Sequence, residues 1–170
     1  VKDALENPKR DVERIVLPPA SYLHEQEKVT KRLPAAIEYI RANKLNEHFG
    51  PKQGKVGIIC QGGHYNGVIR ALQRLGLANM YGDCDVPLHV LNVTYPLLDD
   101  EIIAFAKDKD SLFVIEEGHP AYIEQNIRAF LHKAGARCAV EGKGPLPEAG
   151  ELTGQILLDG LSSYFSNAAP

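Results

Sequence analysis

The 170-residue sequence has few cysteines, and their spacing excludes most cysteine-based structures. Cys60, Cys84 and Cys138 are an odd number, lie far apart and form no CxxC pair. This pattern predicts neither a disulfide framework nor a zinc or iron-sulfur site within the chain. Because Cys60 and Cys138 stand at the ends of apolar segments, where a small thiol is usually buried, we expect both to be structural.

Long hydrophobic runs and concentrated positive charge are also missing. No apolar run approaches the ~20 residues that a membrane span needs, and no secretory leader pattern is visible. The formal net charge is -3, from 19 basic and 22 acidic residues, and the basic residues are scattered instead of forming a stripe. We therefore expect a cytoplasmic protein with neither a membrane nor a nucleic-acid partner.

The length fits one ordinary domain. Residues 1–20 contain three prolines and little periodicity, which predicts an irregular connector, followed by a single domain over 21–170. Because the chain begins with Val1 and not with Met, we expect it to be a fragment of a larger multidomain protein. A helical region follows, which Ser21 is expected to cap and Pro34 to interrupt.

Strand and helix patterns alternate through the remaining sequence. Short apolar runs predict strands over 55–60, 87–93, 111–117 and 137–140. The stretch 77–86 is long enough for a fifth strand, whose bounds the pattern does not define. Helical patterns cover 66–77, 98–108, 120–135 and 151–165, with Asp99 as a cap, Pro120 as a first helical residue, and Gly76 and Gly135 as C-terminal stops. Strands that are apolar on both faces and separated by helices predict a three-layer α/β/α sandwich with a mostly parallel sheet.

A ligand site in such a sheet lies beyond the carboxyl ends of the strands. Polar or glycine residues follow each predicted strand there, and they form a predicted pocket rim. The rim consists of Gln61, Gly62, Gly63, His64, Asn66, Tyr95, Glu116 and Glu117, with Tyr65, Thr94, Glu141, Gly142 and Lys143 beside them.

The turn over residues 61–66 has two interpretations. Its glycines would let backbone amides approach a small anion, but the spacing matches neither GxGxxG nor the P-loop, which favours a simple tight turn. His64 has no orienting partner in the sequence, so a capping or packed role is favoured over proton transfer.

Glu116 and Glu117 are adjacent, so their side chains should point to opposite faces of the sheet and not act together as an acid and a base. We expect one of them to bind backbone amides of the following helix and the other to be free to meet a neighbouring domain. Because no Ser/His/Asp order, HExxH or phosphate-binding lysine motif occurs, the sequence predicts no catalytic residue and no metal site.

Three stretches, taken in order, indicate a family: the TYPL turn at 94–97, the VIEE strand end at 114–117 followed by IEQ at 123–125, and the GK…GELT tail ending at Thr153. Over roughly residues 15–165 the chain resembles the transketolase C-terminal-like domain of thiamine diphosphate-dependent 2-oxoacid:ferredoxin oxidoreductases, most closely the indolepyruvate-type alpha subunit. The matching positions are landmarks and not cofactor ligands: Tyr95, Pro96, Glu116, Glu117, Gly142, Lys143, Glu151 and Leu152.

The resemblance implies a non-catalytic structural or assembly domain in an enzyme that oxidatively decarboxylates 2-oxoacids. It further implies that thiamine diphosphate, magnesium and [4Fe-4S] clusters are held by other segments, that ferredoxin accepts the electrons, and that the partners are other domains or subunits in a homo- or hetero-oligomer. The alternative hypothesis is a freestanding α/β module that binds a small anion, or regulates, through the turn from Gln61 to Asn66.

Overall fold

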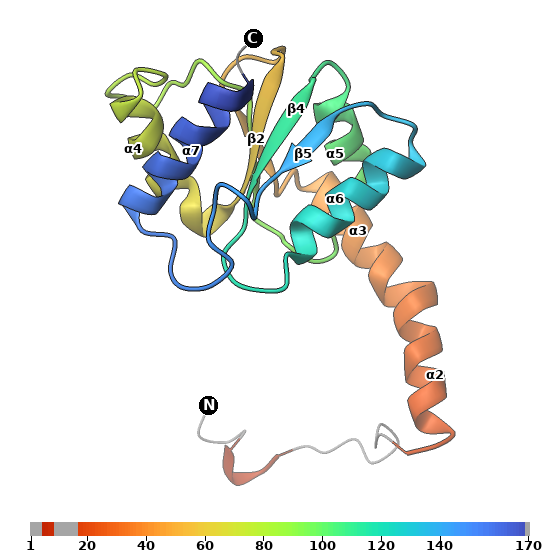
Figure 1. Cartoon of the computed structure of the whole chain (residues 1–170). Coiled ribbons are helices and arrows are strands. Elements are labelled where there is room, and N and C mark those ends of the chain that lie inside the picture. Colours follow the sequence, from red (N-terminus) through yellow and green to blue (C-terminus); the bar gives the residue numbers. More distant parts are fainter. Residues whose placement is uncertain (1–4, 9–16, 169–170) are drawn as a thin grey trace. The chain divides into compact units, whose positions relative to one another are not determined.

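A computed structural model describes residues 5–8 and 17–168 of the protein (Figure 1). The chain divides into two compact units, of which one ends at Tyr39 and the other begins at Ile40. Most of the predicted connector over residues 1–20 lies outside the described residues. Within these residues, no helix is long and apolar enough to cross a membrane.

The N-terminal helical region begins earlier than predicted. Helix α2 (Ala20–Glu27) has Pro19 at its N-cap, so the predicted cap at Ser21 is wrong: the Ser21 amide already donates to the Leu17 carbonyl. Pro34 does not interrupt the helical region as predicted, because α2 continues directly into a π-helical turn, η2 (Lys28–Arg32), and then into helix α3 (Leu33–Ala42). Pro34 thus lies in the first turn of α3, where its missing amide costs least.

One five-stranded sheet organises the second unit, with the strand order β1-β3-β2-β4-β5. Strands β2 (Val56–Gln61), β3 (Leu88–Leu91), β4 (Ser111–Ile115) and β5 (Ala139–Glu141) are parallel and correspond to the four predicted strands. The fifth strand lies outside the predicted segment, 77–86. Residues 77–86 form only an isolated bridge between Ala78 and Cys84, whereas the edge strand β1 (Glu47–Phe49) pairs antiparallel to β3.

Helices cover both faces of the sheet and confirm the three-layer α/β/α sandwich (Figure 1). Helices α4 (Tyr65–Arg74) and α7 (Gly154–Ala168) pack on one face, and α5 (Asp99–Ala106) and α6 (Tyr122–Lys133) on the other. Neighbouring residues of β2 show why two cores form: Ile58 belongs to the α4/α7 core and Ile59 to the α5/α6 core, because side chains alternate along a strand.

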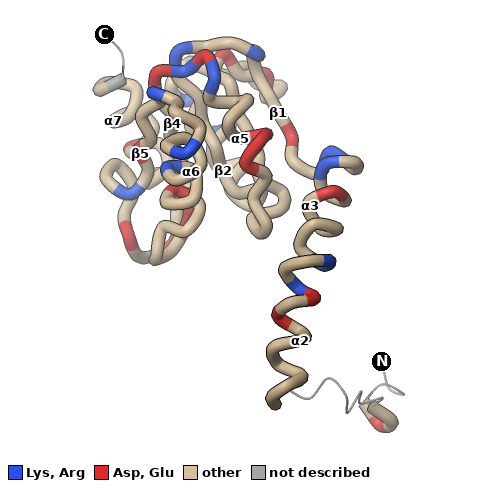
Figure 2. Tube along the Cα trace, turned by 90° about the vertical axis from the view of Figure 1, so that its right-hand side faces the viewer, with Lys and Arg blue, Asp and Glu red and all other residues tan. Residues whose placement is uncertain are grey.

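Two predicted helix starts are shifted, while two predicted stops are confirmed. Asp99 is the first residue of α5 and Leu98 is its N-cap, and α6 begins at Tyr122, two residues after Pro120. Gly76 and Gly135 have positive φ angles of 74° and 67°, as expected of glycines that end helices. Over the part of the chain that the structure describes, basic and acidic residues are interspersed and form no basic stripe (Figure 2).

Candidate functional site

A pocket of about 700 Å³ lies beyond the carboxyl ends of the central strands, where the sequence predicts a site. We call it the strand-end pocket. It is lined by Gln61, Thr94, Tyr95, Pro96, Leu97, Glu116, Glu117, Gly118, His119, Pro120, Tyr122, Ile123, Asn126 and Phe130. Four residues of the predicted rim therefore come together here, namely Gln61, Tyr95, Glu116 and Glu117, whereas Gly62, Gly63, His64 and Asn66 lie outside its lining.

Glu116 caps helix α6, as predicted for one residue of the glutamate pair. Its side chain is buried, and its carboxylate accepts hydrogen bonds from the Ile123 amide (2.9 and 3.0 Å) and the Glu124 amide (3.1 Å). These amides have no partner within the helix, and a negative charge at this end is favourable to the helix dipole. The N-terminus of α6 is therefore stabilised by the Glu116 carboxylate, and Pro120, which was predicted as the first helical residue, lies before the helix.

Glu117 turns to the other face of the sheet, but it is not free to meet a neighbouring domain. Its Oε2 accepts a hydrogen bond of 2.7 Å from the Leu152 amide, and its own amide donates to Gln61 Oε1 at 3.1 Å. The predicted freedom is thus wrong. The sequence holds no local signal for this contact, because Leu152 lies 35 residues further along the chain.

Glu124 completes the arrangement, and the sequence analysis missed it. Its Oε1 accepts from Arg128 Nη2 at 2.8 Å, and its Oε2 accepts from the Lys143 amide at 2.9 Å. A Cβ at Gly142 would collide with Glu124 Oε2, so only glycine fits there. The i,i+4 spacing of Glu124 and Arg128 was a readable signal for their ion pair.

Lys143 ties the same loop to the end of β4. Its Nζ donates to the Glu116 carbonyl at 2.5 Å and to the Pro147 carbonyl at 3.4 Å. We call Glu116, Glu117, Glu124, Gly142 and Lys143 the loop clamp, because together they fix residues 141–152 over the ends of the strands. The family landmarks among them thus have a structural role in the fold.

The glycine turn after β2 has a packing explanation at one of its two glycines. Residues Gly62–His64 form a single 3₁₀ turn, η3, before α4. A Cβ at Gly62 would lie 2.5 Å from Asn92 Oδ1, while Gly63 faces open space. His64 is the N-cap residue of α4, but its side chain makes no cap hydrogen bond. Gly62 therefore serves the close approach of Asn92, in line with the tight-turn interpretation.

The thiols and carboxylates of the described residues do not fit a metal or an iron-sulfur cluster. Burial raises the pKa of Cys60 to about 12 and that of Cys138 to about 11, and it also raises the pKa of Cys84. Cys60 and Cys84 are buried and Cys138 is half-buried. Among the described residues, no group of three or more His, Cys, Asp or Glu side chains could hold a metal ion.

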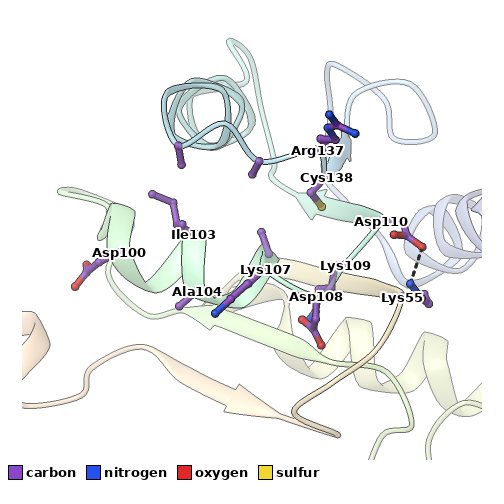
Figure 3. A pocket seen from close by; sticks show the side chains of 13 residues that line it. Lys55, Asp100, Ile103, Ala104, Lys107, Asp108, Lys109, Asp110, Arg137 and Cys138 are labelled. Carbon is purple, nitrogen blue, oxygen red and sulfur yellow. Dashed lines mark hydrogen bonds and ion pairs between the residues drawn. The ribbon is translucent and has the colours of Figure 1, made fainter.

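A larger pocket, of about 840 Å³, opens at the opposite edge of the sheet (Figure 3). We call it the amino-edge pocket, because its lining comes from Lys55 and from the segments before β4 and β5. Its three carboxylates are engaged: Asp110 pairs with Lys55 (3.5 Å), Asp108 with Lys109 (2.8 Å) and Asp100 with Arg41 (3.0 Å). The side chains of two of its cations, Lys107 and Arg137, form no ion pair or hydrogen bond with the described part of the chain.

Known proteins share this fold and parts of this sequence. The chain is 33% identical over 142 residues to indolepyruvate oxidoreductase subunit IorA of Methanothermobacter marburgensis, covering 82% of the chain and 21% of that protein. IorA of Pyrococcus abyssi is 26% identical over 144 residues, with the same coverage. The chain thus spans about a fifth of the length of these curated relatives.

Two solved structures have the same fold. A 2-oxoglutarate:ferredoxin oxidoreductase from Magnetococcus marinus, with 2-oxoglutarate, coenzyme A and succinyl-CoA bound, aligns with a TM-score of 0.58 and 18% identity over 88% of this chain and 24% of its own. A split-gene transketolase, an inactive beta4 tetramer, aligns with a TM-score of 0.50 and 16% identity over 71% of this chain and 41% of its own. The family model for the indolepyruvate oxidoreductase domain matches residues 46–158, and the chain belongs to that family.

Proposed function

We propose that this domain is a non-catalytic structural element of an enzyme that oxidatively decarboxylates 2-oxoacids of the indolepyruvate type and passes the electrons to ferredoxin. The family membership supports the enzyme class. The curated relatives are named as oxidoreductase subunits, and each is roughly five times longer than the part that matches, which supports partner domains or subunits elsewhere. The enzyme would be a cytoplasmic oligomer.

The loop clamp is the observation that carries the structural role. Acid-base catalysis needs a carboxylate that is free to exchange a proton with a substrate, whereas Glu116 and Glu117 each accept hydrogen bonds from backbone amides. The nearest amine, Lys143 Nζ, donates to two backbone carbonyls. Among these groups the Glu116 carboxylate thus caps α6, while Glu117 and Lys143 hold the loop over 141–152 in place.

Thiamine diphosphate, magnesium and [4Fe-4S] clusters would be held by other parts of the enzyme. When bound there, they supply the carbanion and electron-transfer chemistry. Two features of this domain support that division: among its described residues no group of three or more His, Cys, Asp or Glu side chains could hold a metal ion, and the carboxylates of Glu116 and Glu117 accept hydrogen bonds from backbone amides. The domain would then position its neighbours and border their shared site.

Calorimetric titration of this chain with thiamine diphosphate and Mg²⁺ tests the proposal. We expect no binding heat, and micromolar binding would overturn the non-catalytic role. A second test uses the full-length enzyme. Lys143→Met should lower its melting temperature while the dissociation constant for thiamine diphosphate stays unchanged, and the exposed Lys133→Met is the matched control. A Lys143→Met enzyme of normal stability that has lost turnover would contradict a purely structural role.

No observation favours the alternative of a freestanding anion-binding module. Gly62, Gly63, His64 and Asn66 lie outside the strand-end pocket, and that pocket has no Lys or Arg in its lining. Titration of the chain with inorganic phosphate gives a direct answer, since a module of this kind should bind it through the turn.

A further inference from the structure

Residues 77–85, which we call the Met-Tyr loop, connect α4 to β3 and are held rigidly by hydrogen bonds. The side chain of Asn79 organises its tip: Oδ1 accepts from the Tyr81 amide (2.9 Å) and the Asp83 amide (3.0 Å), and Nδ2 donates to Asp83 Oδ2 (2.8 Å). Gln73 Nε2 donates to the Asn79 carbonyl, and the Asp85 amide to the Leu77 carbonyl. These hydrogen bonds hold the tip in a defined conformation without a partner.

This rigid tip presents two large apolar side chains to solvent. Met80, the only methionine in the sequence, is 82% exposed, and Tyr81 is 85% exposed. Methionine and tyrosine are enriched at protein interfaces, and tyrosine is a frequent hot-spot residue. Because the loop is already ordered, binding through it costs little conformational entropy. These properties indicate a docking element for another protein surface.

Charge identifies which surface of this chain complements the loop. Asp83 and Asp85 are exposed beside the tip, and no Lys or Arg occurs from residue 75 to residue 87. The strand-end pocket has no Lys or Arg in its lining, so it offers the carboxylates of the loop no such partner. The amino-edge pocket combines apolar side chains such as Ile103 with the unengaged cations Lys107 and Arg137.

Topology allows the two surfaces to meet in a closed pair. The Met-Tyr loop precedes β3 on the face covered by α4 and α7 (Figure 1). The lining of the amino-edge pocket places it at the same edge of the sheet, beside α5 and α6. A two-fold axis at this edge would let each copy insert its loop into the other copy's pocket, which closes the assembly as a dimer. We propose that two copies of this chain associate edge to edge, with Met80 and Tyr81 of each in the amino-edge pocket of the other.

Sedimentation velocity over a concentration series measures the pairing. We expect the wild-type chain to dimerise, and the double variant Met80→Ser/Tyr81→Ser to weaken the dimer by about 30-fold, the size of a hot-spot loss. Tyr122→Ser is the matched control, because Tyr122 is 64% exposed at the other edge of the sheet. Circular dichroism checks that each variant is folded, which is expected because the loop is held by groups that these substitutions keep.

A charge swap tests the geometry of the pair. Asp85→Lys and Arg137→Glu should each weaken the homodimer about tenfold, because each sets like charges opposite each other in both contacts. Mixing the two variants should restore wild-type affinity, since the heterodimer has one swapped and one native contact. The proposal is overturned by a wild-type chain that stays monomeric up to about 1 mM, by a dimer that the Met80→Ser/Tyr81→Ser variant leaves intact, or by variants that do not rescue each other.

Discussion

His89 should make the stability of the domain depend on pH below neutrality. It lies on β3 with 0% of its surface exposed, and neither ring nitrogen has a hydrogen-bond partner of normal geometry among the described residues. Its ring stacks on His48 at 4.3 Å and lies 5.5 Å from Phe105. Burial, and after it the neighbouring His48, lower the pKa of His89 to about 3, while the Glu47 backbone acts in the opposite direction.

The sign and size of the effect follow from proton linkage. In the unfolded chain His89 has its ordinary pKa of 6.5, so between pH 6.5 and about 3 the unfolded state binds a proton that the folded state does not. The contribution of neutral His89 to the free energy of unfolding is fully present above pH 6.5. It is lost as the pH falls through this window, at up to about 1.4 kcal/mol per pH unit. At pH 4.5 the loss is about 3 kcal/mol, a large share of the roughly 5–15 kcal/mol of a typical domain.

Urea unfolding at a series of pH values measures this loss. His89→Leu keeps a side chain of similar size but removes the titrating group, so the slope of the unfolding free energy between pH 6.5 and 4.5 should fall by about 1 kcal/mol per pH unit. A smaller slope should persist, because burial also lowers the pKa of His48. Gln125→Leu, at an exposed and non-titrating position of α6, should leave the wild-type slope unchanged. An unchanged slope in His89→Leu would refute the reasoning.

Four further outcomes are expected. Glu116→Ala removes the cap of α6 and should cost about 2 kcal/mol in urea unfolding, against less than about 0.5 for the exposed Asp99→Asn control; equal losses would contradict the capping role. Gly142→Ala forces a Cβ into an occupied space and should cost about 1–3 kcal/mol. Tyr164→Phe breaks its buried hydrogen bond to a serine on β4, and thermal unfolding should show a loss of about 1 kcal/mol. Because burial raises the pKa of Cys60 to about 12, a thiol reagent at pH 8 should modify it only after unfolding, and rapid labelling of the native chain would count against its burial.

The parallel core of the sheet was predictable because its signal is local. Runs such as 112–115 are apolar at every position, a composition typical of a strand buried on both faces. The edge strand β1 was missed for the opposite reason. It has three residues, two of them polar and exposed, and it becomes a strand only by pairing Glu47–Phe49 with Leu88–Val90. Such a strand depends on a tertiary contact that no window of the sequence contains.

In the candidate site, too, features set by local sequence were predictable, whereas contacts between distant segments were not. Alternation along a strand was sufficient to predict that Glu116 and Glu117 face opposite sides of the sheet and that one of them caps the next helix. The partner of Glu117 was not predictable, because Leu152 reaches it only after the chain has passed through α6 and β5. The clamp therefore joins segments that lie far apart in the sequence, since its acceptors lie after β4 and on α6 and its donors lie in the returning loop. Glu117, Gly142 and Lys143 thus have a role in placing the loop. Glutamate and lysine are also common catalytic residues, so their presence at the ends of the strands does not by itself indicate catalysis.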